Sequence, residues 1–278
     1  MHPAMKPAAS PSSDSVRDSV REHYAAIQSA SGGAACAPGC CGSNPDASLE
    51  LGYAQSDLDA LPEGANLGLG CGNPQELARL KAGERVLDLG SGGGIDCFLA
   101  AKRVGPTGRV IGVDMTPEML KSARAAKQRM RADNVEFRLG EIEHLPIADG
   151  TIDVILSNCV INLSPDKQQV CREAFRVLAP GGRLAIRDVV ATAPMPEALA
   201  KDPRMVAGCV GAAAPIAELE AALRQAGFRS VDIDVDESSR AVIATWFPGS
   251  GAERYVASAS ITAKKGGGCG CEPGASCG

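Results

Sequence analysis

From residue 84 onward, short apolar runs alternate with stretches of helical periodicity. Runs such as RVIGVDM and DVILS are almost continuously apolar, which is typical of strands buried on both faces of a sheet. The segments between them repeat apolar residues every three to four positions, as amphipathic helices do. The predicted strands cover 85–91, 109–115, 134–140, 151–158 and 181–190, and the predicted helices cover 96–104, 117–132 and 165–178. This alternation predicts an α/β fold with a doubly wound, mostly parallel sheet.

The flanking segments have different patterns. SVRDSVREHYAAIQSA (15–30) repeats apolar residues along one helical face, whereas residues 61–74 are dense in Gly and Pro and are expected to be irregular. After residue 191 we expect a helix over 215–228 with Gly227 as its C-cap. Three further strands are predicted at 231–237, 241–247 and 254–264, either as the last strands of the sheet plus an extension or as a small α+β subdomain.

These changes of pattern predict five regions along the chain. A disordered leader (1–14) precedes an N-terminal helix with Cys/Gly-rich loops (15–74). The α/β domain covers 75–192, and a small C-terminal α+β extension covers 193–263. A flexible Cys/Gly-rich tail follows at 264–278.

Composition and charge narrow the function classes. The chain has one Trp, three Tyr and five Phe, a net charge of −5 and no long basic run, which argues against a nucleic-acid partner. Apolar stretches stay well short of the roughly 20 residues that span a bilayer, so no membrane association is expected. The first residues also lack the apolar core of a secretory signal, so we expect a cytoplasmic protein.

Eleven cysteines are the unusual feature of the composition. An odd number without a secretory signal favours metal-binding, catalytic or core thiols over a disulfide framework. One group lies in the Gly-rich segment before the α/β region, a second lies in the tail, and the rest are scattered. The three groups are Cys36, Cys40 and Cys41; Cys269, Cys271 and Cys277; and Cys71, Cys97, Cys159, Cys171 and Cys209.

The stretch VLDLGSGGG (86–94) lies where the first predicted strand meets its helix. Glycines allow the backbone to approach a ligand closely there, and the helix N-terminus offers free N–H groups. The dinucleotide pattern G-x-G-x-x-G would need a glycine at position 95, where the chain has Ile95. Asp114, at the end of the second strand, is placed to accept hydrogen bonds from ribose hydroxyls. A flavin or nicotinamide domain is the alternative to the cofactor considered next.

The pattern D-x-G-x-G-x-G, together with LAPGGRL (178–184), resembles the class I S-adenosylmethionine-dependent methyltransferases. The resemblance implies S-adenosylmethionine as cofactor and a Rossmann-like sheet. It implies that the glycine loop surrounds the methionine part and that the ends of the next two strands meet ribose and adenine. The implied cofactor-binding residues are Asp88, Gly90, Ser91, Gly92, Gly94, Asp114, Met115, Glu141, Ile142 and Asn158.

Three scattered thiols lie where a substrate is expected. Cys159 follows the fourth predicted strand, and ligands of open α/β sheets bind at the carboxyl ends of strands. Cys71 and Cys209 lie among small residues in other loops, and the three share no zinc-site spacing. Thiolates are soft ligands that suit trivalent arsenic, a centre that takes three sulfurs. Cys97 and Cys171 are expected to pack in the core.

GANLGLGCGNP, VLDLGSGGGIDCFLA, SNCVINLSPDKQQV and MVAGCVGAA together resemble the arsenite methyltransferases over about residues 15 to 262. The resemblance implies that Cys71, Cys159 and Cys209 bind arsenic(III), supplied as arsenite or its thiol conjugates. It further implies that an N-terminal cysteine forms a disulfide with Cys71 during turnover. Cys36, Cys40 and Cys41 compete for that role, with Cys41 favoured, and thioredoxin or glutathione would be the reductant.

Two alternatives stay open at this point. A methyltransferase for a carbon or oxygen acceptor, such as a quinone or sterol, would need an apolar, aromatic-lined pocket. A soft-metal binding or sensing protein would bind arsenite through the same thiols without releasing a methylated product. The terminal cysteine clusters could capture a soft metal or have no function. We expect the protein to be a monomer.

Overall fold

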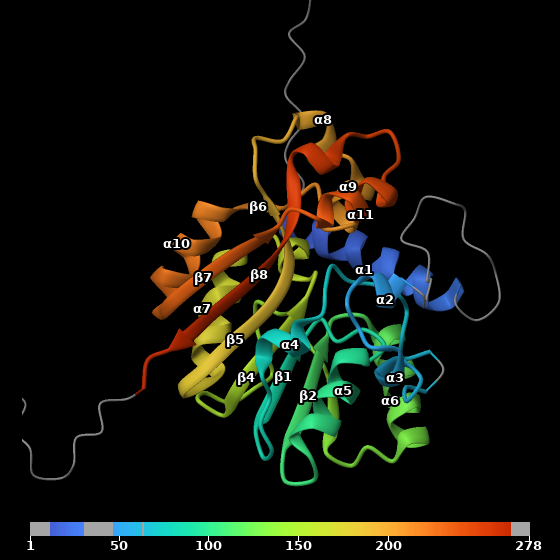
Figure 1. The fold of residues 1–278 in the computed structure, drawn as a ribbon, viewed down its shortest axis with the longest axis vertical. Helices are drawn as coiled ribbons and strands as arrows, with labels where there is room; N and C mark the ends of the chain where they lie inside the picture. Colours follow the sequence, from blue (N-terminus) through green and yellow to red (C-terminus); the bar gives the residue numbers. More distant parts are fainter. Residues whose placement is uncertain (1–11, 31–46, 63, 268–278) are drawn as a thin grey trace, which may run out of the picture.

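The computed structural model describes residues 12–30, 47–62 and 64–267. Its centre is one mixed sheet with the strand order β3-β2-β1-β4-β5-β8-β7, and β6 pairs with β5 (Figure 1). The strands are β1 (Arg85–Leu89), β2 (Arg109–Asp114), β3 (Val135–Leu139), β4 (Ile152–Asn158), β5 (Leu178–Ala191), β6 (Ala214–Pro215), β7 (Phe228–Asp236) and β8 (Val256–Lys265). The pairings from β3 to β5 are parallel, and those of β8 with β5 and β7 are antiparallel. The predicted mostly parallel α/β fold is confirmed.

Helices cover both faces of this sheet (Figure 1). Along β1, Val86 belongs to a buried cluster with residues of α5 and α6, whereas its neighbour Leu87 belongs to another with residues of α7 and α10, because successive side chains of a strand point to opposite faces. Both side chains are fully buried. The helices are α1 (Ser13–Ala30), α2 (Ala47–Glu50), α3 (Gln55–Leu58), α4 (Pro74–Ala78), α5 (Ile95–Val104), α6 (Pro117–Met130), α7 (Lys167–Val177), α8 (Glu197–Ala200), α9 (Pro203–Ala207), α10 (Ile216–Ala226) and α11 (Ser239–Trp246), with 3-10 helices η1 (Ile161–Leu163) and η2 (Ala252–Arg254).

The residues after 192 return to the same sheet. β7 and β8 extend it beyond β5, which decides between the two alternatives for this region in favour of last strands plus an extension. The helix expected over 215–228 forms as α10, and Gly227 ends it in the left-handed region at φ 109°. The domain boundaries proposed from the sequence stay predictions.

The strand predicted at 241–247 is wrong, because this segment forms α11. Its apolar composition fits a strand locally, but tertiary packing overrides such a preference. The Ser239 hydroxyl donates to the Asp236 carbonyl at the start of the helix, and Ile243 is buried one turn later. Arg240 ties the helix to the following segment by donating to the carbonyl oxygens of Glu253 and Val256.

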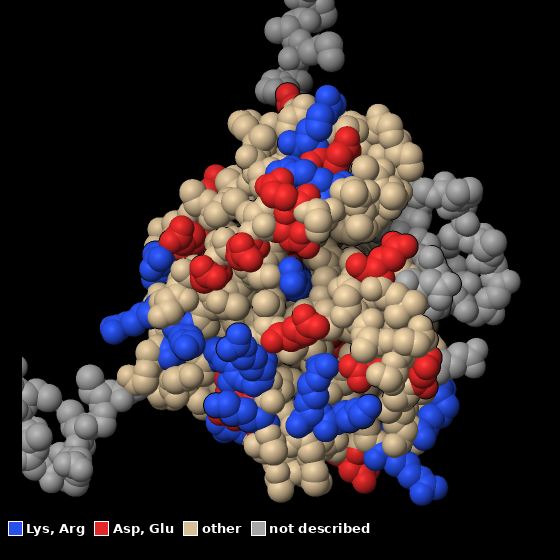
Figure 2. All heavy atoms as spheres, viewed as in Figure 1, with Lys and Arg blue, Asp and Glu red and all other residues tan. Residues whose placement is uncertain are grey.

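The outer surface carries mixed charge. On the face drawn in Figure 2, acidic and basic side chains are interspersed, in keeping with the small net charge. Among the described residues, the structure contains no helix that is both long enough and apolar enough to cross a bilayer.

Candidate active site

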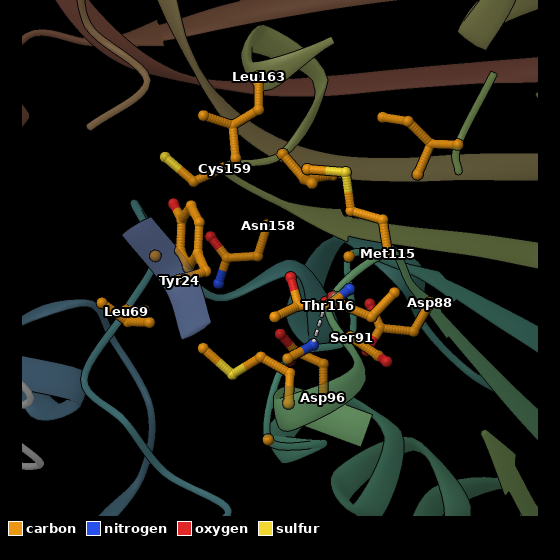
Figure 3. A pocket seen from close by; sticks show the side chains of 18 of the residues that line it. Tyr24, Leu69, Asp88, Ser91, Asp96, Met115, Thr116, Asn158, Cys159 and Leu163 are labelled. Carbon is orange, nitrogen blue, oxygen red and sulfur yellow. Dashed lines mark hydrogen bonds between the residues drawn. The ribbon is translucent and has the colours of Figure 1, made fainter. Parts of the chain in front are cut away.

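A cavity opens beside the carboxyl ends of β1, β2 and β4 (Figure 3). Its walls come from segments that are far apart in the sequence: α1, the loop before α4, the glycine loop after β1 and the turn after β4. The order of strands changes direction between β1 and β4, and such switch points create ligand crevices in open α/β sheets. The fold therefore places a cavity at the sheet edge where the sequence predicted the cofactor site.

The glycine loop owes its shape to several close contacts. The backbone N–H groups of Gly90 and Ser91 both donate to the Val113 carbonyl, at 2.8 and 3.1 Å. A Cβ on Gly93 would lie 2.8 Å from the carbonyl oxygens of Gly64 and Ala65, so this glycine is needed for packing of the preceding loop. The glycine loop is thus held by β2 on one side and by the loop at residues 64–65 on the other.

Gly92 has a different environment within the same loop. A Cβ on this residue would meet nothing within 4 Å, and its φ of 50° lies in the left-handed region. Its N–H donates to Oδ2 of Asp114 at 2.9 Å, and Oδ1 of the same carboxylate accepts from the Thr116 N–H at 2.8 Å. Gly92 is therefore a point at which a ligand can approach the backbone closely.

Several acidic side chains line the cavity. Asp88, Asp96 and Asp114 line it, and burial raises the pKa of each carboxyl, most strongly that of Asp88, which Asp96 raises further. The Ser91 hydroxyl is buried and has no hydrogen-bond partner within the described part of the chain. Buried carboxylates without a cation are costly, so this site suits a cationic ligand that also offers hydrogen-bonding groups.

Most of the residues predicted to bind a cofactor line this cavity, including Met115, Ile142 and Asn158. Gly94 and Glu141 are not among the lining residues, and the Glu141 carboxylate instead pairs with Arg17 at 3.4 Å. Glu143 lies at the cavity in its place and pairs with Arg17 at 3.3 Å. Glu143 was not predicted from the sequence, although it lies only two residues further along the same loop.

The structure joins two of the three predicted arsenic ligands directly. Cys71 and Cys159 form a disulfide, with their Cα atoms 5.8 Å apart and a sequence separation of 88. The third, Cys209, is buried, and its thiol donates to the Cys159 carbonyl at 2.7 Å. Cys159 and Cys209 both have positive φ angles, 58° and 63°, which are uncommon for residues other than glycine and cluster at functional sites.

The carboxylate of Asp188 lies close to this disulfide. Potential ligand atoms of Cys71, Cys159 and Asp188 lie within 4.8 Å of one another, whereas Cys209 is not part of this cluster. Asp188 carries no local sequence signal, because nothing distinguishes it from other polar residues near the end of an apolar strand. Only the return of β5 next to β4 reveals its position.

The other cysteines within the part of the chain that the structure describes are Cys97 and Cys171. Cys171 packs in the core as predicted, and burial raises its pKa to about 11. Cys97 is fully buried and donates to Oδ2 of Asp88 at 3.2 Å, so it packs as expected. The candidates for the redox disulfide and the tail cysteines lie outside the described residues: Cys36, Cys40, Cys41, Cys269, Cys271 and Cys277.

Comparisons with known proteins identify the family. Residues 80–234 match a model described as a methyltransferase domain. The arsenic(III) S-adenosylmethionine methyltransferase of Chlamydomonas reinhardtii has a similar structure, with a TM-score of 0.57 and 32% identity, covering 81% of this chain and 74% of that one. The chain belongs to the arsenite methyltransferase family. This assignment excludes the flavin and nicotinamide alternatives.

Two curated members of the arsenite methyltransferase family show how far the match extends. The arsenite methyltransferase of Halobacterium salinarum is 51% identical over 229 residues, which cover 82% of this chain and 59% of the relative. That of Aquipseudomonas alcaligenes is 48% identical over 153 residues, which cover 52% of this chain and 44% of the relative. The chain thus spans about half the length of the curated relatives that it matches.

S-adenosylmethionine is the cofactor of this family of arsenite methyltransferases. The residues at the cavity fit it on physical grounds. Its sulfonium and ammonium groups suit the buried carboxylates of Asp88 and Asp96, and its ribose hydroxyls suit Asp114. The unpartnered Ser91 hydroxyl and the open approach to Gly92 add groups that a ligand can contact.

Proposed function

We propose that this protein transfers methyl groups from S-adenosylmethionine to trivalent arsenic held by Cys71, Cys159 and Cys209. The observation that carries the proposal is the direct pairing of Cys71 with Cys159, because Cys159 also lines the cavity that fits the cofactor. The contact of the Cys209 thiol with the Cys159 carbonyl supports its membership of the same site. Catalysis would rest chiefly on positioning the arsenic beside the methyl group.

Thiolates explain why arsenic is the favoured acceptor. They are soft ligands, and trivalent arsenic bound to three sulfurs keeps a lone pair that can attack a methyl carbon without losing a proton. S-adenosylmethionine supplies the electrophilic methyl group when it is bound. Asp88, Asp96 and Asp114 would hold and orient its charged and hydroxyl groups, and Val20 and Tyr24 of α1 would exclude water from that side of the cavity.

The thiols must be reduced before arsenic can bind. Two electrons convert the disulfide of Cys71 and Cys159 into two thiols, and a dithiol such as thioredoxin, or glutathione, would supply them. Methylation formally oxidises arsenic, so a cysteine pair must also return it to the trivalent state. We infer that an N-terminal cysteine, with Cys41 favoured, takes part in this cycle of the monomeric enzyme.

The number of thiolates required falls as methylation proceeds. Each methyl group on arsenic occupies one coordination position, so methylarsenite needs two thiolates where arsenite needs three. Cys71 would then be required for the first methylation and dispensable for the second, which Cys159 and Cys209 would support.

A product assay tests the proposal. Reduced protein is incubated with S-adenosylmethionine, arsenite and a thiol, and methylated arsenicals are separated by chromatography. We expect product from the wild type, at least a hundredfold less from Cys159→Ser, and near wild-type amounts from Cys171→Ala, which removes a core thiol away from the cavity. Arsenite binding without product would favour a metal-binding or sensing protein, and unchanged product from Cys159→Ser would refute the thiolate site.

A further inference from the structure

A chain of hydrogen bonds connects the cofactor cavity with the arsenic site. The buried Tyr53 hydroxyl donates to the two carboxylate oxygens of Asp96, at 3.1 and 3.0 Å. The side-chain NH₂ of Asn158 donates to that hydroxyl at 3.0 Å and to the Gly72 carbonyl at 2.8 Å. The side-chain carbonyl of Asn158 in turn accepts from the backbone N–H of Cys71 at 2.9 Å.

The direction of this chain is dictated by its first member. The Tyr53 hydroxyl has a single proton, which it shares between the two oxygens of the Asp96 carboxyl group, so Tyr53 donates to Asp96. The phenol keeps its proton at neutral pH, because burial and the neighbouring Asp96 raise the pKa of Tyr53 well above its usual range. The phenol oxygen can then only accept from Asn158, which turns the NH₂ group toward Tyr53 and the carbonyl toward Cys71.

This orientation matters because Asn158 is linked to both sulfurs. Its backbone leads directly into Cys159, while its side chain holds the loop that carries Cys71. The loop packs closely on the amide: a Cβ on Gly70 would lie 2.7 to 2.9 Å from the atoms of the Asn158 side chain. Without the hydroxyl of Tyr53 the amide keeps only its bonds to the Gly72 carbonyl and the Cys71 N–H, so it is held less firmly beside the loop that carries Cys71.

We propose that Tyr53 is a positioning residue of the arsenic site, which fixes the Asn158 amide and thereby holds the Cys71 sulfur beside that of Cys159. This inference rests on the proposed function. Tyr53 lies 18 residues before Cys71 and outside every motif that identified the family. Because Cys71 is needed only for arsenite, the loss of the Tyr53 hydroxyl should impair the first methylation and spare the second.

The test compares two substrates in one variant. Tyr53→Phe keeps the ring and removes the hydroxyl, and its kcat/KM is measured with arsenite and with methylarsenite. We expect kcat/KM for arsenite to fall about tenfold, in line with one lost hydrogen bond at a buried site, and kcat/KM for methylarsenite to stay within about twofold. Both reactions use the same cofactor cavity, so any effect on cofactor binding cancels in their ratio. Tyr255→Phe, which removes a hydroxyl outside the cavity lining, should leave the ratio unchanged.

A chemical measurement gives the same information without catalysis. Dibromobimane bridges neighbouring thiols, and peptide mapping of the reduced protein reports the rate of bridging between Cys71 and Cys159. We expect this rate to be several-fold lower in Tyr53→Phe than in the wild type. If Tyr53→Phe does not fold, Asn158→Ala is used, with the same selective loss toward arsenite expected.

The outcomes separate this inference from the proposed function. A wild type that methylates neither substrate overturns the proposed function. An active wild type with an unchanged ratio in Tyr53→Phe, or with equal losses on both substrates, overturns only the role of Tyr53. A selective loss toward arsenite together with slower bridging supports it.

Discussion

At the scale of single residues, Asp188 shows how the fold controls the chemistry near the sulfurs. Its buried carboxylate accepts from the backbone N–H groups of Ile161 and Val189, at 2.9 and 2.8 Å, and from the side chain of Asn162 at 2.8 Å. Burial nevertheless outweighs these bonds and raises its pKa from 3.8 to about 6. The same Asn162 also accepts from the N–H of Ala214, so the carboxylate helps to join the segments after β4 and β5.

The raised pKa of Asp188 predicts a pH-dependent stability. The folded state binds the proton more tightly than the unfolded chain, so the contribution of Asp188 is greatest below pH 4 and is lost as the pH rises to about 6. A shift of this size corresponds to at most about 3 kcal/mol. Urea unfolding of the oxidised protein and of Asp188→Asn, between pH 4 and 7, should show the wild type losing stability relative to the variant as the pH rises. A difference that is independent of pH would contradict the assignment.

At the scale of elements, α1 closes one side of the cofactor cavity. Arg17, Val20 and Tyr24 line the cavity from this helix, which packs against α6 and α9. The side chain of Arg17 is 15% exposed, and its partner Glu143 is 4% exposed and also accepts from the Ser164 hydroxyl at 2.7 Å. A largely buried pair of this kind is sensitive to the loss of one partner, because the other is left as an uncompensated charge.

Arg17→Gln should therefore weaken cofactor binding through α1. We expect the Kd for S-adenosylmethionine, measured by calorimetry, to rise about tenfold, because α1 would lose the largely buried ion pair that holds it against the cavity. Arg21→Gln is the matched control one turn along the same helix: its side chain is 38% exposed and pairs mainly with Asp18. Exposed pairs contribute little, so the control should change Kd less than twofold. Equal effects of the two substitutions would show that α1 contributes only through its overall charge.

At the scale of the whole molecule, the disulfide of Cys71 and Cys159 closes a loop across the sheet. It joins the segment before β1 to the end of β4, with a sequence separation of 88. Cross-linking a loop of this length restricts the unfolded chain and stabilises the fold by roughly 4 kcal/mol. In the reduced protein, arsenite bound to the same sulfurs would restore such a link by binding only the folded state.

Thermal unfolding can measure the loss of the disulfide on reduction and its replacement by bound arsenite. We expect reduction to lower Tm by roughly 10 °C, in line with the loss of about 4 kcal/mol, and arsenite to restore much of it. In Cys159→Ser, neither reduction nor arsenite should change Tm by more than a few degrees. A Cys159→Ser variant that responds to arsenite as strongly as the wild type would place the binding site elsewhere.

Local patterns in the sequence determined most elements of the fold, and they selected most of the predicted cofactor-binding residues that line the cavity. The strands are apolar because they are buried on two faces. The glycines of 90–94 directly follow β1, and Asp114 is the last residue of β2. The prediction is wrong where local preference and tertiary packing disagree. Residues 241–247 suit a strand by composition but form α11 because of contacts with distant segments.

Only the tertiary structure decided which distant residues meet. The pairing of Cys71 with Cys159, the approach of Asp188 and the contact of Tyr53 with Asn158 all join segments that no periodicity relates. Family motifs selected the three cysteines, yet they said nothing of Tyr53 or Asp188. The physical reason is that hydrophobic periodicity reports which face of an element is buried, whereas the partner of a buried polar group depends on how elements pack after the chain has folded.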